Sequence, residues 1–156
     1  MMKINNLPVL ICLVIISLFA NQAYAAEWIF LGAVPTGDQY YNKKSIEEVN
    51  KNIFHVLIKE RYNDNGKMSK FSFLKKTGNA PNNPYVLSHE LRLLEINCAN
   101  KKIKVSSDSI YDKQGHVIAS MPRSYVKRSD IFPDSIAKTL NNTVCSAGQP
   151  SPKKKK

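Results

Sequence analysis

The clearest alternation of apolar and polar positions lies in residues 52–62. Phe54, Val56 and Ile58 share one parity, whereas polar residues such as His55 take the other. Successive side chains of a β-strand point to opposite faces, so a period of two predicts a strand with one buried and one solvated face. We therefore expect this segment to lie in a β-sheet.

Turn-forming residues divide much of the remaining chain into short strands. Residues 35–38, 63–66 and 112–115 are rich in Pro, Gly, Asn and Asp, which favour turns. A further hairpin turn is expected at Ala99-Asn100. The strands predicted between these turns and the loops are 27–34, 39–42, 70–75, 85–98, 101–111 and 116–121.

Three connecting segments are predicted to be irregular. Residues 43–50 form a turn region in which Ser45 caps a brief helical turn, and residues 77–84 form a loop containing Gly, Asn and Pro. Pro122 ends the strand before it, and residues 124–132 follow as an irregular segment.

The apolar phase changes within the long segment 85–98. Leu91 and Leu93 have one parity, and Leu94 and Ile96 have the other. A bulge near Leu93 would reconcile this change with one continuous strand. A helix over 88–94 is the alternative, and the hairpin turn that follows favours the strand.

The last predicted element is a helix over residues 135–144. Asp134 is expected to cap it, and Ile136, Leu140 and Val144 are spaced to form one apolar stripe. The predicted fold class is therefore α+β, an antiparallel β-sheet meander of about six strands with one C-terminal α-helix.

The first residues have the three parts of a secretory signal peptide. Lys3 precedes an apolar run at 7–20, and Ala-Tyr-Ala follows at 23–25. The run is about 14 residues long, shorter than the roughly 20 that a transmembrane helix needs. We expect cleavage after Ala25, which leaves no transmembrane anchor in the mature chain.

The remaining chain divides into one domain and a tail. Residues 26–146 suit a single α+β domain, and residues 147–156 are predicted to be a disordered, lysine-rich tail. A lipid anchor is the alternative to a free protein. However, Cys12 lies inside the apolar run rather than at its end, so we interpret it as an ordinary member of that run.

Cleavage would leave two cysteines, Cys98 and Cys145. Exported proteins meet an oxidising compartment, so these two are expected to form a disulfide that clamps the helix onto the sheet. Closing a loop of this length contributes about 4 kcal/mol in chain-entropy terms. A metal site or a reactive thiol is the alternative, but the chain has no C-x-x-C motif.

The chain is strongly basic. It has 23 Lys and Arg against 12 Asp and Glu, a formal net charge of +11, and Lys153–Lys156 supply four of the positive charges. Such a surface attracts anionic glycans or lipids in a salt-dependent way, although a solvated face is also a sufficient explanation. We expect no nucleic acid partner outside the cytoplasm.

No catalytic motif is present: the chain lacks G-x-S-x-G, H-E-x-x-H, a P-loop and G-x-G-x-x-G. The three histidines are scattered. We therefore expect no enzyme activity, no catalytic residues, no cofactor and no metal site. Tyrosines on strands and nearby basic residues form the candidate binding surface, which comprises Tyr40, Tyr41, Lys59, Tyr62, Lys101, Lys102, Lys127 and Arg128.

Several landmarks follow one another in a set order along the chain. They are Trp28, Tyr40-Tyr41, Ser45-Ile46, the strand 53–62, Leu94-Glu95-Ile96-Asn97-Cys98, Tyr111, Gly115, Val117, and the segment from Pro133-Asp134-Ser135 to Val144-Cys145. This order resembles the bacterial surface-adhesin protein E family. Phe54 and Phe132 stand where the family leads us to expect tryptophan.

This resemblance implies an exported envelope protein of a Gram-negative bacterium that binds host extracellular-matrix protein or glycan. No sharp binding motif carries over to named residues. Two alternatives remain open: a periplasmic accessory protein that binds an envelope component, and a small secreted effector or inhibitor. The sequence is compatible with the periplasm, the outer surface or secretion.

Overall fold

The structure, a computed structural model, describes residues 26–122 and 127–147. The predicted signal peptide, and the lysine-rich tail from residue 148 onward, lie outside the described residues. No helix within the described part of the chain is long and apolar enough to cross a membrane.

The described strands form one antiparallel sheet. Its main path is a meander in which each strand pairs with the next, and two short strands pair beside it, β3 with β4 and β8 with β6. The strands are β1 (Trp28–Val34), β2 (Gly37–Asn42), β3 (Glu47–Asn50), β4 (Ile53–Tyr62), β5 (Leu87–Asn97), β6 (Lys102–Asp112), β7 (Val117–Pro122) and β8 (Ser129–Asp130).

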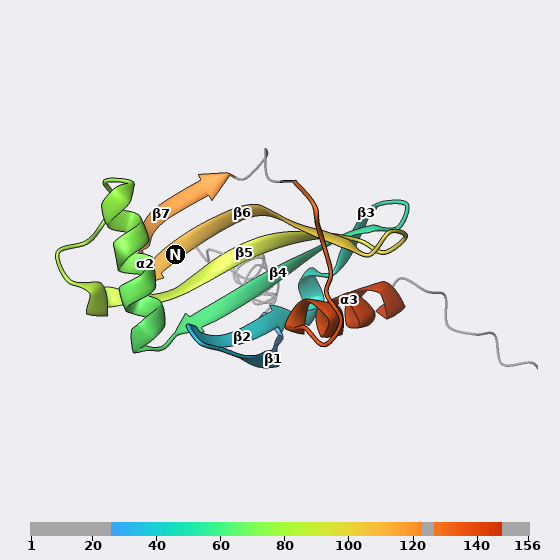
Figure 1. The fold of residues 1–156 in the computed structure, drawn as a ribbon, viewed down its shortest axis with the longest axis horizontal. Helices are drawn as coiled ribbons and strands as arrows, with labels where there is room; N and C mark the ends of the chain where they lie inside the picture. Colours follow the sequence, from blue (N-terminus) through green and yellow to red (C-terminus); the bar gives the residue numbers. More distant parts are fainter. Residues whose placement is uncertain (1–25, 123–126, 148–156) are drawn as a thin grey trace, which may run out of the picture.

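Two α-helices, α2 (Asp64–Lys76) and α3 (Ile136–Ala147), lie on the same face of this sheet, one toward each end (Figure 1). Two short 3₁₀ helices, η1 (Lys43–Ser45) and η2 (Pro84–Val86), occur in connections. The α+β class and the C-terminal helix are thus as predicted, and α2 is an additional element. We call the helix-bearing side the covered face and the opposite side the open face.

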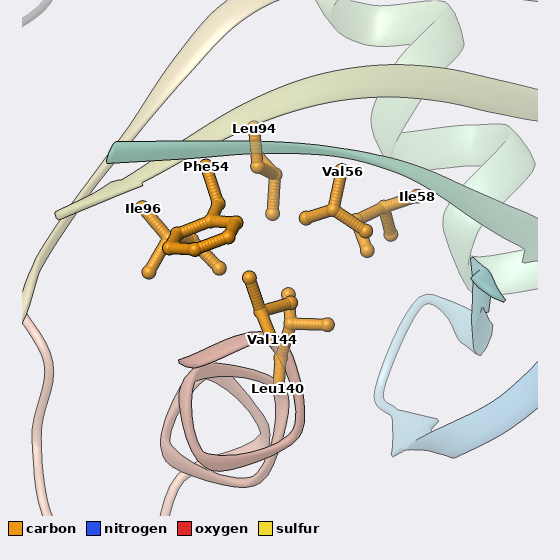
Figure 2. Packing of buried hydrophobic residues seen from close by; sticks show 7 residues of the cluster. All are labelled: Phe54, Val56, Ile58, Leu94, Ile96, Leu140 and Val144. Atoms are coloured by element: carbon orange, nitrogen blue, oxygen red, sulfur yellow. The ribbon is translucent and has the colours of Figure 1, made fainter. Parts of the chain in front are cut away.

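The larger part of the core lies under α3. Figure 2 shows side chains from β4 and β5 pointing toward Leu140 and Val144 on the helix. The apolar side chains predicted for one face of β4 therefore pack against the apolar stripe predicted for α3. The buried residues of this cluster are Phe54, Val56, Ile58, Leu94, Ile96, Leu140 and Val144.

A disulfide links α3 to the sheet, as predicted. The sulfur atoms of Cys98, directly after β5, and Cys145 in α3 are 2.00 Å apart. A second, smaller cluster lies under α2 at the other end of the covered face and comprises Tyr62, Leu74, Leu87 and Ile110.

A row of polar side chains crosses the covered face between the two clusters. We call Gln39, Glu60, Glu90, Arg92 and Asp108 the polar belt; its three carboxylates are buried. Arg92 Nη2 lies 2.8 Å from Glu60 Oε2, and Arg92 Nε lies 3.2 Å from Glu90 Oε1. Buried charges are tolerated only when they are paired and hydrogen-bonded. Arg92 hydrogen-bonds Glu60 and forms an ion pair with Glu90.

The polar belt forms hydrogen bonds and an ion pair with the surrounding elements. The Thr36 hydroxyl donates to Glu60 at 2.6 Å, and the Gln39 amide donates to the same carboxylate at 2.8 Å. Glu90 accepts from the Tyr62 hydroxyl at 3.1 Å and pairs with Lys70 of α2. Burial and the Glu90 carboxylate raise the pKa of Tyr62 far above its ordinary value.

Two predictions between β4 and η2 are wrong. Residues 63–66 do not form a turn between strands, and residues 70–75 do not form a strand; both lie at or within α2. The side chain of Asn63 accepts a hydrogen bond from Gly66 N at 2.9 Å, so it caps the helix. Leu74 is fully buried against the sheet, which stabilises the helix by tertiary packing.

Two smaller predictions also need correction. The turn region 43–50 contains strand β3, and Asn42, not Ser45, caps its helical turn. At α3 the Ser135 hydroxyl accepts from Lys138 N at 3.1 Å, so Ser135 takes the capping role that was predicted for Asp134.

The long strand predicted over residues 85–98 is confirmed as β5. Its change of apolar parity has a different cause from the one predicted. The ladder between β5 and β6 shifts register at Leu93/Leu94, as predicted, but the extra residue is Ser106 on β6. Leu91 and Leu93 lie opposite Lys59 and Leu57 on the open face. Their parity therefore differs from that of the core residues because they face the other side of the sheet.

Candidate binding surface on the open face

No helix in the described part of the chain covers the open face. The pairing register of the strands places the side chains of the open face in rows that cross the strands. One row consists of Phe30, Tyr40, Lys59, Leu91 and Ser109. Because alternate residues of each strand point to this side, the face gathers residues that are distant in sequence.

Aromatic rings and cations concentrate at the β1–β2–β4 side of this face. Phe30 and Tyr40 meet edge to face, with ring centroids 5.5 Å apart. Lys59 Nζ lies 4.2 Å from the Trp28 ring centroid and 5.8 Å from that of Tyr40. We call Trp28, Phe30, Tyr40, Lys59 and Arg61 the aromatic–cation cluster.

The cations of the cluster are held in different ways. Arg61 lies 5.8 Å from the Tyr40 ring, and its Nη2 donates to Asp38 at 2.9 Å, so an anionic neighbour offsets its charge. Lys59 lies against the rings, and partial burial followed by repulsion from Arg61 lowers its pKa. Phe30 is 58% exposed, which leaves apolar surface beside these charges.

A second aromatic pair lies farther across the sheet. His89 and Tyr111 stack with ring centroids 4.9 Å apart and planes only 3° from parallel. Burial, followed by the charge of Lys59, lowers the pKa of His89, so this imidazole is neutral at pH 7. The β7 side is more polar: the Ser109 and Ser120 hydroxyl oxygens lie 2.6 Å apart.

The other end of the open face carries an ion-pair group around Glu95. Lys104 Nζ lies 3.3 Å and His55 Nε2 lies 3.7 Å from Glu95, and Arg128 Nε donates to it at 3.0 Å. Partial burial opposes ionisation of Glu95, but the hydrogen bonds from Arg128 and Lys104 outweigh it and lower the pKa. With Lys104 and Arg128 against one carboxylate, the group carries a net positive charge, although both cations are paired with Glu95.

The structure brings together only some of the predicted surface residues. Tyr40 and Lys59 face each other across β2 and β4 on the open face. Tyr41 packs against the α3 cluster, and Tyr62 is 7% exposed beneath α2, so both lie on the covered face.

The basic pairs of the predicted surface lie away from the aromatic–cation cluster. Lys101 is exposed in the turn between β5 and β6, and Lys102 Nζ lies 3.7 Å from Asp130. Arg128 joins the Glu95 group, and Lys127 is exposed near α3.

Sequence reasoning missed four residues of this face: Trp28, Phe30, Arg61 and His89. The parity of Trp28 with Phe30, and of Lys59 with Arg61, was available as a signal that each pair shares a face. What the sequence could not supply was the register that places Phe30 opposite Tyr40 and Tyr40 opposite Lys59.

In the ranges 26–122 and 127–147, no group of three or more His, Cys, Asp and Glu could hold a metal ion. The open face is a broad surface of aromatic, cationic and hydroxyl groups, which suits contact with another molecule by stacking and hydrogen bonding.

Comparison with known proteins gives one finding. The family model described as surface-adhesin protein E matches residues 28–146, which is more than half of the chain. No curated protein and no solved structure matches this chain.

Proposed function

The chain belongs to the surface-adhesin protein E family, and on that premise we propose that it is an exported, non-enzymatic adhesin of the bacterial envelope. In this proposal it contacts a host extracellular-matrix protein or an anionic glycan through the open face. The signal peptide brings it across the inner membrane, and its working position is the outer surface.

The aromatic–cation cluster is the observation that carries the proposal. Aromatic residues and arginine are enriched where protein interfaces derive most of their binding energy, and Trp28, Phe30 and Tyr40 lie together with two cations. Phe30 is the most exposed of these rings. A ligand on this face would bury apolar surface and meet positive charge in one contact.

The charge of the chain favours an anionic partner. With a net charge of +11, its field accelerates encounter with acidic surfaces, and this effect weakens as salt is added. Binding through the open face should therefore combine a salt-sensitive association rate with a salt-insensitive aromatic contribution.

Protease shaving of intact cells tests the position that this function requires. We expect added protease to degrade the protein while a periplasmic control protein survives. Survival of both until the outer membrane is opened would contradict the adhesin proposal and support a periplasmic accessory role. Recovery of the protein from culture supernatant instead of the cells would contradict it in favour of a secreted effector or inhibitor.

A further inference from the structure

The covered face contains a groove that the proposed adhesion does not use. It lies between α3 and the polar belt and has a volume of about 230 Å³. Ile58, Leu94 and Val105 line it from the sheet, and Ala137 and Leu140 line it from the helix. Figure 2 shows Ile58 and Leu94 pointing from the sheet toward Leu140.

The groove runs across the strands. Its lining begins with Leu31 on β1, passes β4 and β5, and reaches Ile103 on β6. Neighbouring strands are about 4.8 Å apart, so the four strand spacings from β1 to β6 correspond to roughly 19 Å. An elongated groove of this length suits a linear chain better than a compact fused ring system.

The two long walls of the groove differ in polarity. The α3 wall is apolar, whereas Gln39 and Arg92 of the polar belt line the other side. The carboxylates of Glu60 and Glu90 offset the charge of Arg92. Arg92 therefore makes this wall polar without adding uncompensated charge to it.

A cation lies at the β8 end. Lys127 lines the groove, is exposed, and makes no ion pair within the described part of the chain. Lys104 is also among the lining residues, but its ammonium lies on the open face, 3.3 Å from Glu95. Lys127 is therefore the group whose charge is available to an anion, and the β1 end at Leu31 is apolar.

We infer that this groove binds the anion of a free medium-chain fatty acid. The carboxylate lies at Lys127, and the alkyl chain lies between α3 and the sheet toward Leu31. Burial of the chain supplies most of the binding free energy, because each methylene removed from water is favourable. The single positive charge at one end sets the orientation.

Titration calorimetry on the full-length protein, expressed with its own leader and delipidated, tests this inference with octanoate, decanoate and decanol. We expect saturable binding of decanoate, with a Kd roughly tenfold lower than that of octanoate because two more methylenes are buried. Absence of saturable decanoate binding, or equal Kd values for the two acids, would overturn the inference. Association with anionic phospholipid vesicles without binding of decanoate would overturn it in favour of a membrane surface.

Two pairs of variants locate the ligand. Ala137→Phe fills the groove and should weaken decanoate binding at least tenfold, whereas Thr139→Phe, exposed on the same helix, should leave it unchanged. Lys127→Gln should weaken binding of decanoate but not of decanol, and Lys113→Gln in the distant β6–β7 turn should affect neither. Thermal melts establish that each variant is folded.

The charge variants keep the test decisive if Ala137→Phe does not fold. Unchanged decanoate binding in Lys127→Gln would contradict the orientation, and unchanged binding in a folded Ala137→Phe would contradict the site. Because the groove and the open face lie on opposite sides of the sheet, failure here is distinguishable from failure of the adhesin proposal.

Discussion

Gly66 allows the first turn of α2 to approach the connection between β1 and β2. A Cβ atom at this position would lie 2.0 Å from the backbone oxygen of Thr36 and 3.2 Å from Tyr62 Cβ. The same residue donates its backbone N–H to the side chain of Asn63 at 2.9 Å. Only glycine permits the cap and the close approach together.

Gly66→Ala should therefore lower the free energy of unfolding by about 1–3 kcal/mol, the usual range for overpacking. We expect this loss of stability although alanine is a better helix former than glycine by about 1 kcal/mol. Urea denaturation provides the measurement, with Ser69→Ala on the exposed side of the same helix as control, expected within about 0.5 kcal/mol of wild type. A Gly66→Ala protein as stable as wild type would contradict this account of α2 docking.

The same residues show why α2 was not predicted. Asn63, Asp64 and Gly66 are all favoured in turns, and asparagine is equally favoured as a helix cap. In the following segment Phe71 and Phe73 alternate as in a strand, yet the fully buried residue is Leu74. Packing of Leu74 against the sheet decides between the two structures, and that contact is not encoded locally.

At the scale of elements, prediction succeeded where the periodicity was strong and sustained. The alternation of Phe54, Val56 and Ile58 predicted the buried face of β4, and the spacing of Leu140 and Val144 predicted the face of α3. The export signal predicted the pairing of Cys98 with Cys145. Short elements such as β3 and β8 were missed because they are defined by pairing with a neighbour.

The disulfide should make a large contribution to the stability of α3 on the sheet. Its cysteines are separated by 47 residues in sequence. Replacing both by serine should lower the free energy of unfolding by about 2–4 kcal/mol, because the unfolded chain gains the freedom that the crosslink removes.

Urea denaturation of the Cys98→Ser/Cys145→Ser protein provides this measurement. Wild-type protein in excess dithiothreitol is the matched control and should unfold at nearly the same urea concentration as the double variant. An unchanged midpoint in the double variant would show that α3 is held by its apolar contacts alone.

At the scale of the whole molecule, the sheet separates two surfaces with different chemistry. The covered face carries both helices (Figure 1), together with the polar belt and the groove. The open face carries the aromatic–cation cluster. Net charge alone predicted an anionic partner but not its position. The open face is assembled from strands distant in sequence, so its composition depends on register rather than on any local motif.

The most direct test of the account compares two double variants in binding to a surface coated with basement-membrane matrix, with heparin as the glycan probe. Phe30→Ser/Lys59→Gln alters the open face, and Phe73→Ser/Lys76→Gln removes the same types of group from α2, where both side chains are exposed. We expect the first to weaken binding at least tenfold, as loss of a dominant contact does, and the second to bind like wild type. Equal binding by the two variants would contradict the assignment of adhesion to the open face.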